Sequence, residues 1–193
     1  MGRKGAPMMT RTNYLKLLIT ALFAGLVAVT VGVPIANAST ATAVNTSSIS
    51  EQVRHNLVML PWYGVFDNLQ YQVNGTEVVL SGEVISEHGI TKDDAANAVK
   101  KIPGVTNVVN NIEILPPSPF DNQIRRAEYR AIFSQSDLGR YTLGVIPQVH
   151  IIVKGGHVTL EGQVINQMDR TVAGIAANSV PGVFSVQNNL QVG

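Results

Sequence analysis

Four histidines are the side chains best suited to proton transfer or metal binding, namely His55, His88, His150 and His157. They show neither an H-x-H nor an H-x-x-x-H spacing, the patterns that bring two imidazoles to one face of a strand or helix. His150 and His157 fall on the two strands of a predicted hairpin, as diagonal neighbours on its solvated face. A metal site needs more ligands of the right kind. We therefore expect surface histidines, no metal and no other cofactor.

The residue types of a nucleophilic site are also present, but without the context that such a site needs. Serine, aspartate and histidine are scattered, and no nucleophile elbow or triad pattern is recognisable. Asp93 and Asp94 begin a predicted helix, where the helix dipole stabilises negative charge. Gly155-Gly156 is a turn between strands and not a strand-to-helix phosphate loop. We expect no catalytic residues; a hydrolase would require folding to gather scattered Ser, His and acid side chains.

A cluster of basic and aromatic side chains is the best candidate for ligand binding. It consists of Arg125, Arg126, Tyr129, Arg130 and Phe133, within three turns of a predicted helix. The four-residue spacings place neighbours on one face, which could contact anionic headgroups while an aromatic ring reaches the acyl boundary. The alternatives are a solvated face partly neutralised by Glu128, or aromatic packing into the neighbouring domain.

An internal repeat organises the chain. Residues 73–85 are matched at 153–165, and the Pro-Gly pairs that follow keep an offset of 78 residues. The matched positions that we expect to be structural are Gly75 and Gly155, Leu80 and Leu160, Gly82 and Gly162, Pro103 and Pro181, and Gly104 and Gly182. Two copies of over 60 residues indicate two tandem globular domains and not a solenoid.

The first copy begins with a predicted helix. Ser48-Ile49-Ser50-Glu51 has the form of a capping box, so the helix should start there, and Pro61 should end it. Its apolar stripe comprises Ile49, Val53, Leu57 and Leu60. Trp62 and Tyr63 follow the helix and either pack locally or anchor an interface.

A hairpin should follow this helix. With Asn74-Gly75 as a two-residue loop, Tyr71 faces Val78 and Leu69 faces Leu80, which puts the apolar residues of both strands on one side. The fold class is therefore α+β: two tandem αββαβ domains, each a three-stranded mixed sheet with two helices on one face.

Gly82 and Gly162 lie within the second strand of each hairpin. We expect glycine there because a helix approaches the backbone closely, in preference to a ligand site. That helix carries Ala95, Ala98, Val99 and Ile102 in the first copy and ends at a Pro-Gly pair. In the third strand, Val105 to Ile114, Asn110 should hydrogen-bond a loop or bulge, as should Asn188 in the second copy.

These elements give the domain boundaries. A flexible leader covers 39–47, the first domain 48–114, a Pro-rich linker 115–120 and the second domain 121–193. The first helix of the second domain should run from Phe120 to about Ser134, with Asp121 as its cap. Its predicted inner stripe is Ile124, Ala127 and Ala131. An insertion, Gln135 to Leu143, then separates this helix from the hairpin.

Residues 1–38 have the pattern of a secretory signal peptide. Arg3, Lys4, Arg11 and Lys16 precede an apolar run, Leu17 to Ile35, and Ala36-Asn37-Ala38 has the A-x-A form of a cleavage site. We expect cleavage after Ala38, periplasmic localisation and no transmembrane segment afterwards; the alternative is a retained membrane anchor. No cysteine is available for lipid attachment or a disulfide.

Removing this leader changes the charge balance. The full chain has 14 Lys and Arg against 13 Asp and Glu, and without the four basic leader residues the net charge becomes −3. Nucleic-acid binding needs a clustered positive surface, which this balance does not favour. We therefore expect no nucleic-acid partner.

The two copies resemble the BON domain, the bacterial osmotic-stress and nodulation module. The resemblance rests on the segments Val78 to Val84 and Ile102 to Val105, and on their counterparts Val158 to Val164 and Val180 to Val183. It implies an αββαβ fold, no catalytic residues, and an envelope protein similar to osmotically inducible periplasmic proteins with two such domains. Family members are thought to contact phospholipid or to assist periplasmic proteins under stress.

Two functions remain open. The first is a non-enzymatic envelope module that binds phospholipid or an envelope protein weakly and peripherally. The second is a periplasmic chaperone or adaptor that acts through an exposed apolar patch or sheet edge. The sequence does not define the oligomeric state.

Overall fold

The structure is a computed structural model and describes residues 38–85 and 92–193. The signal-peptide prediction for residues 1–38 falls outside the described residues apart from Ala38, and so does His88. Residues 37–193 form one compact unit. Within the described ranges, no helix combines the length and hydrophobicity that a bilayer crossing requires.

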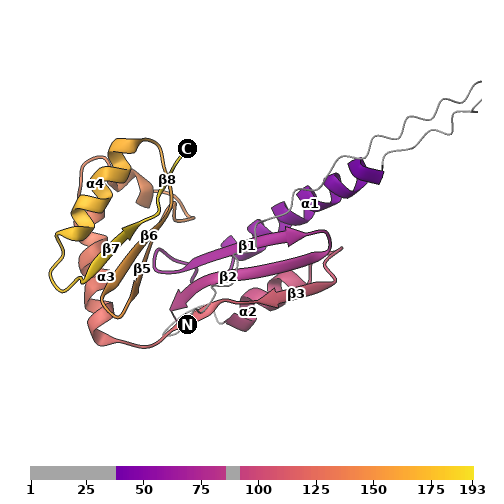
Figure 1. Cartoon of the computed structure of the whole chain (residues 1–193), viewed down its shortest axis with the longest axis horizontal. Helices are drawn as coiled ribbons and strands as arrows, with labels where there is room; N and C mark the ends of the chain where they lie inside the picture. Colours follow the sequence, from indigo (N-terminus) through magenta and orange to yellow (C-terminus); the bar gives the residue numbers. More distant parts are fainter. Residues whose placement is uncertain (1–37, 86–91) are drawn as a thin grey trace, which may run out of the picture. The chain divides into compact units, whose positions relative to one another are not determined.

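The chain contains two repeats of the same order of elements (Figure 1). Repeat 1 comprises α1 (Ala38–Val58), β1 (Asn68–Asn74), β2 (Glu77–Ile85), α2 (Lys92–Lys100), β3 (Asn107–Asn110) and β4 (Glu113–Leu115). Repeat 2 comprises α3 (Pro119–Phe133), the 3-10 helix η1 (Gly139–Thr142), β5 (Val149–Lys154), β6 (His157–Val164), α4 (Gln167–Asn178), β7 (Ser185–Asn188) and β8 (Gln191–Val192). The domain boundaries within this order remain predictions.

Each repeat is built on a mixed sheet, as the sequence predicts. In repeat 1 the central strand β2 pairs antiparallel with β1 and parallel with β3 and β4. In repeat 2, β6 pairs in the same way with β5, β7 and β8. The two helices of each repeat pack against each other and on the sheet. The predicted α+β class is confirmed.

Helix α1 begins at Ala38, so the predicted start at Ser48 was wrong. Residues 39–47, assigned to a flexible leader, are placed in this helix. Ser48 lies inside it, where its hydroxyl and carbonyl oxygens accept hydrogen bonds from Gln52, one turn later. The capping-box prediction failed because a Ser three residues before a Glu also fits a helix interior. The predicted apolar stripe is buried except for Leu60, which is partly buried.

The hairpin register differs from the prediction by two residues. Val73 pairs with Val78 and Tyr71 with Leu80, so the turn is Gly75-Thr76 and not Asn74-Gly75. Gly75 has a φ of 65°, which suits the first central position of a tight turn. A shift of two residues keeps every side chain on its predicted face, and the apolar set still meets on one side.

The explanation predicted for Gly82 and Gly162, the close approach of a helix, was wrong. Both have positive φ, 104° and 112°, and a Cβ there would lie 1.9 Å from the carbonyl oxygen of Asn68 or 2.1 Å from that of Gln148. These carbonyl groups lie at the start of the neighbouring strand and not in a helix. Glycine is therefore required by a kink of the central strand against its antiparallel partner.

Two equivalent asparagines interrupt the third strand of each repeat. The Asn110 amide donates to the Lys92 carbonyl oxygen at 2.7 Å and accepts from the Ile112 N–H at 3.2 Å. Asn188 does the same with Arg170 and Leu190, at 2.7 and 3.2 Å. The predicted hydrogen bond to a loop or bulge is confirmed by the Ile112 and Leu190 N–H groups, which lie in the breaks after β3 and β7. The second bond of each amide reaches the first turn of the helix that precedes the strand. Ile112 and Leu190 are thereby directed into the two cores.

Candidate functional site

Helix α3 carries the basic and aromatic cluster, and its start is fixed by two side chains. The Ser118 hydroxyl caps the helix by accepting from the Asp121 N–H at 3.1 Å. Asp121 is therefore not the cap that the sequence predicts. Its carboxylate accepts from the N–H groups of Gly155 and Gly156, at 2.9 and 2.8 Å. The helix is thus tied to the β5–β6 turn.

The buried face of α3 differs from the predicted one. Ile124 is buried as expected, but Ala127 and Ala131 are only half-buried. Arg125 is 4% exposed and donates to the Val153 carbonyl oxygen at 2.7 Å and to Asn122 Oδ1 at 2.5 Å. Arg125 was therefore wrongly included in the surface cluster, because helical spacing alone does not show that a long side chain bonds to the sheet beneath it.

Arg126 and Arg130 are exposed on α3. Neither forms an ion pair with another described residue. Tyr129 lies between them in sequence; its ring centroid is 4.9 Å from that of Phe133 and 6.4 Å from that of Phe66. The aromatic side chains thus pack together and against the segment before β1, as one of the alternatives anticipated. We call Arg126 and Arg130 the arginine pair.

Glu128 is completely buried in the middle of α3. Neither of its carboxyl oxygens has a hydrogen-bond partner among the described residues. Desolvation by burial raises the pKa of Glu128 from 4.5 to about 8. Glu128 is therefore a neutral acid at neutral pH and does not neutralise the arginine pair.

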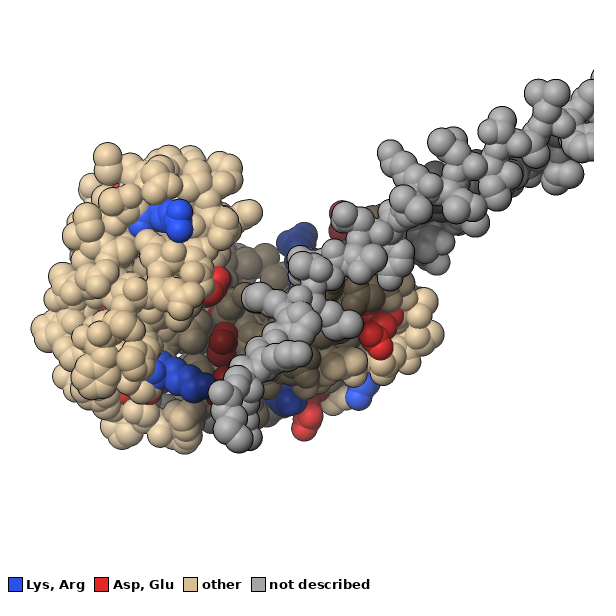
Figure 2. Space-filling view, viewed as in Figure 1, with Lys and Arg blue, Asp and Glu red and all other residues tan. Residues whose placement is uncertain are grey.

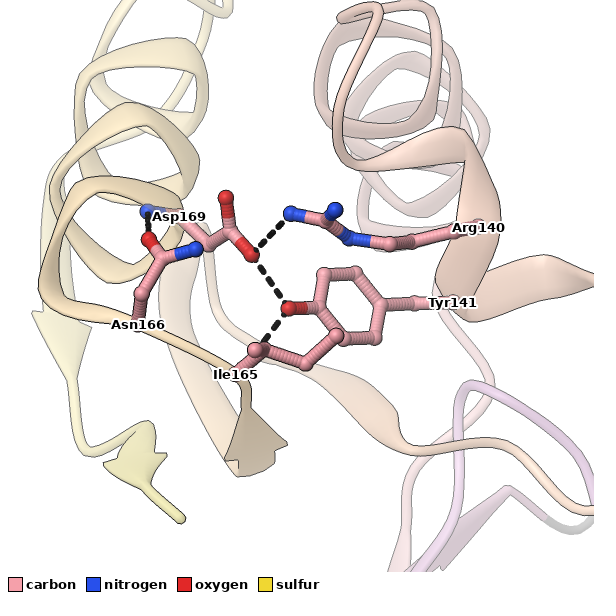
Figure 3. Close-up of polar contacts among 5 residues, drawn as sticks. All are labelled: Arg140, Tyr141, Ile165, Asn166 and Asp169. Carbon is pink, nitrogen blue, oxygen red and sulfur yellow. Dashed lines mark hydrogen bonds and ion pairs between the residues drawn. The ribbon is translucent and has the colours of Figure 1, made fainter.

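The insertion that distinguishes repeat 2 is anchored by a polar cluster (Figure 3). Tyr141 of η1 is buried; its hydroxyl donates to Asp169 near the start of α4 and accepts from the Ile165 N–H at 2.8 Å. Arg140 lies 2.5 Å from the same Asp169 oxygen. Burial favours a higher pKa for Asp169, but the hydrogen bonds from Tyr141 and Arg140 hold that pKa below its usual value.

An apolar loop follows η1. We give this name to residues 143–146, Leu-Gly-Val-Ile, of which Leu143 is 85% and Val145 99% exposed. A pocket of about 210 Å³ lies beside it. Its lining combines Tyr129 and Phe133 of α3 with Thr142, Gly144 and Pro147 of the insertion, together with Val65, Tyr141 and Val149. The loop therefore adjoins the face of α3 that carries the aromatic residues.

The three histidines that the structure describes do not converge. His55 and His157 are exposed, as expected. His150, expected on a solvated face, is buried, and its Nε2 lies 3.4 Å from the Tyr63 hydroxyl. Burial lowers the pKa of His150 and raises that of Tyr63 to about 12. The expectation failed because the segment before β1 covers this strand: the Ile151 N–H donates to the Val65 carbonyl oxygen at 2.7 Å.

Within residues 38–85 and 92–193, no group of three or more His, Cys, Asp or Glu side chains could hold a metal ion. Trp62 and Tyr63, predicted together, have different environments. Tyr63 is half-buried against His150, with ring centroids 5.5 Å apart. Trp62 is exposed and has a φ of 69°, unusual for a bulky residue.

Sequence reasoning missed Glu128 as a core residue and the apolar loop as a surface feature. Glu128 stands four residues from both Ile124 and Ile132, which is a signal for the buried face. The loop forms an uncharged run between Tyr141 and Val149, in a segment longer than its counterpart in repeat 1.

Comparison with known proteins identifies a family. The family model of the BON domain matches residues 45–116 and 138–193. The second matched segment begins after α3, so the arginine pair lies outside it, whereas the apolar loop lies inside. No curated protein matches the chain.

Two solved structures show a distant likeness. Both are of CdsD, a structural protein of the type III secretion system of Chlamydia trachomatis. One, of the C-terminal domain, is 14% identical and covers 74% of this chain and 96% of its own, with a TM-score of 0.28. The other is 14% identical and covers 76% and 93%, with a TM-score of 0.27. Likenesses at this level add nothing to the family assignment.

Proposed function

The chain belongs to the BON domain family, and from this membership we propose that it is a non-enzymatic module of the bacterial cell envelope. The signal-peptide pattern of residues 1–38 supports export to the periplasm. The duplicated fold supports a role like that of osmotically inducible protein Y, the periplasmic two-domain protein that its sequence resembles. The proposed function of this chain is maintenance of the cell envelope under osmotic stress.

The proposed ligand is anionic phospholipid, and the arginine pair carries this proposal. Arg126 and Arg130 stand one turn apart on α3, exposed and without an ion-pair partner among the described residues. Each Lys or Arg near an anionic membrane contributes about 1 kcal/mol of attraction, which salt screens. Two arginines would therefore give weak, peripheral and salt-sensitive binding.

The distribution of charge does not favour nucleic acid as the ligand. On the face shown in Figure 2, Lys and Arg side chains are few and scattered among uncharged residues. The exported chain would carry a net charge of −3. A nucleic-acid interface needs a basic stripe that neutralises many phosphates.

The test is co-sedimentation of the chain from Ser39 to Gly193 with vesicles containing phosphatidylglycerol. The Arg126→Glu/Arg130→Glu variant should lose most of the binding. Lys100→Glu/Lys101→Glu is the matched control, because it makes the same charge change at exposed positions of repeat 1 and should keep the binding. Equal losses in both variants would show a general charge effect and would contradict the assignment to α3.

A periplasmic chaperone or protein adaptor is the second candidate. The observation that favours it is the apolar loop, because exposed Leu143 and Val145 could contact apolar segments of a client protein. This function predicts that the exported chain suppresses the aggregation of an unfolded client at stoichiometric concentration. No effect on aggregation would remove this candidate.

A further inference from the structure

The apolar loop is a feature of repeat 2 that the family assignment does not explain. We propose that residues 143–146 insert into the acyl region of an anionic bilayer while the arginine pair contacts its headgroups. This inference rests on the proposed lipid-binding function and adds to it a second contact, of a different chemical kind.

The composition and exposure of the loop suit a bilayer better than water. Leu143 is 85% and Val145 99% exposed, and Ile146 is also exposed. No charged residue occurs between Tyr141 and Val149. Single exposed apolar residues are ordinary on soluble proteins, but three within four residues at a loop tip form a patch that marks an interaction site.

The base of the loop is held in place on both sides. Before it, Leu138 and Tyr141 are buried in the core of repeat 2, and the Tyr141 hydroxyl is fixed between Asp169 and the Ile165 N–H (Figure 3). After it, Val149 enters β5 and is buried. A tip projected from an anchored base loses less conformational freedom on binding than a loose segment would.

The loop adjoins the aromatic residues of α3, the helix that carries the arginine pair, which is why we favour a membrane as the occupant. The pocket of about 210 Å³ is lined by Tyr129 and Phe133 of α3 and by Thr142, Gly144 and Pro147 of the insertion. Tyr129 is next to Arg130 in sequence and three residues from Arg126. These features match the layers of an anionic bilayer: the arginines suit the phosphate headgroups, the aromatic side chains suit the boundary below them, and the uncharged apolar tip suits the acyl region.

Fluorescence at the loop tip tests the insertion. The chain contains no cysteine, so Val145→Cys creates a unique site for an environment-sensitive dye such as NBD. Asn97→Cys, at an exposed position of α2, is the matched control. With phosphatidylglycerol vesicles the dye at position 145 should brighten severalfold and shift to the blue, and the dye at position 97 should not. Equal responses at both positions would overturn the inference.

A second variant separates this inference from the proposed function. Leu143→Ser/Val145→Ser removes two exposed apolar side chains and should weaken vesicle binding at least tenfold, while the melting temperature stays unchanged. Native-like binding of this variant, with binding lost in Arg126→Glu/Arg130→Glu, would overturn the inference alone. Absence of binding by the native chain would overturn both. Dye brightening that depends on protein concentration and needs no vesicles would overturn the inference in favour of a second copy as the occupant.

Discussion

Val53 of α1 and Glu128 of α3 occupy equivalent positions in the two repeats, and both are completely buried. Each stands four residues from two buried apolar residues: Ile49 and Leu57 around Val53, Ile124 and Ile132 around Glu128. Repeat 1 places a branched apolar side chain at this point of its core, and repeat 2 places a carboxylic acid. An ionised carboxylate without partners is strongly disfavoured there, so the acid keeps its proton.

The burial of Glu128 predicts that the stability of the folded chain falls as the pH rises. The pKa of Glu128 is about 8 in the folded chain, against 4.5 as its ordinary value. The contribution of Glu128 to the free energy of unfolding is therefore fully present below pH 4.5 and is lost progressively up to about pH 8. The loss is at most about 5 kcal/mol.

Urea unfolding between about pH 6.5 and 9 should measure this loss as a slope that levels off above pH 8. Asp169 and His150, on elements packed against α3, have lowered pKa values, so they stabilise the fold increasingly as the pH rises and cannot produce this loss. The pKa of Arg140 is raised, so Arg140 remains charged throughout. Glu128→Gln should abolish the slope; an unchanged slope in that variant would assign it to another group.

Glu128→Val copies the residue of repeat 1 into repeat 2. It should raise the free energy of unfolding by about 1–4 kcal/mol at pH 8, because it replaces an unpartnered polar group with an apolar one. The reciprocal change, Val53→Glu, should destabilise repeat 1. Chemical denaturation followed by circular dichroism measures both, and destabilisation by Glu128→Val would show that the carboxyl group has a stabilising partner.

Gly162→Ala should destabilise the chain strongly. The new Cβ would lie 2.1 Å from the Gln148 carbonyl oxygen, at a φ of 112°. Backbone strain alone costs about 1–3 kcal/mol, and the clash adds to it. Gly75→Ala is the control, because its φ is also positive but nothing lies within 4 Å of the added Cβ. The melting temperature of Gly162→Ala should lie well below that of Gly75→Ala. Similar melting temperatures would refute the steric explanation.

Asp169→Asn should loosen the insertion of repeat 2. It removes the charge that Arg140 and the Tyr141 hydroxyl share, at a cost of about 1–3 kcal/mol. Hydrogen exchange of the amides in residues 138–148 should accelerate. Glu113→Gln affects the exposed ion pair with Lys154, at 2.6 Å, and should change stability by less than about 1 kcal/mol. Equal protection of residues 138–148 in the native chain and Asp169→Asn would show that the cluster does not anchor the loop.

The sequence predicted the repeated order of elements because period and turn chemistry are local signals. The alternation around Tyr71 and Val78 gave the correct faces, yet the register was wrong by two residues, since either of two turns around Gly75 keeps that alternation. The kink at Gly82 could not be foreseen, because it depends on the carbonyl group of Asn68 across the sheet.

The candidate site was predicted only in part. Helical spacing grouped Arg125 with Arg126, although one bonds to β5 and the other faces solvent. Spacing cannot decide between these outcomes, because an arginine side chain is long enough to reach either. His150 was misjudged for a similar reason: the segment that contains Tyr63 covers it, and strand periodicity carries no information about distant segments.

Equilibrium binding of the chain from Ser39 to Gly193 to vesicles of graded composition is the most direct test of the lipid-binding function. Binding should rise with the fraction of phosphatidylglycerol and should weaken severalfold between about 50 and 300 mM salt. Binding that is equal on purely zwitterionic vesicles, or absent on all of them, would contradict an anionic membrane as the ligand.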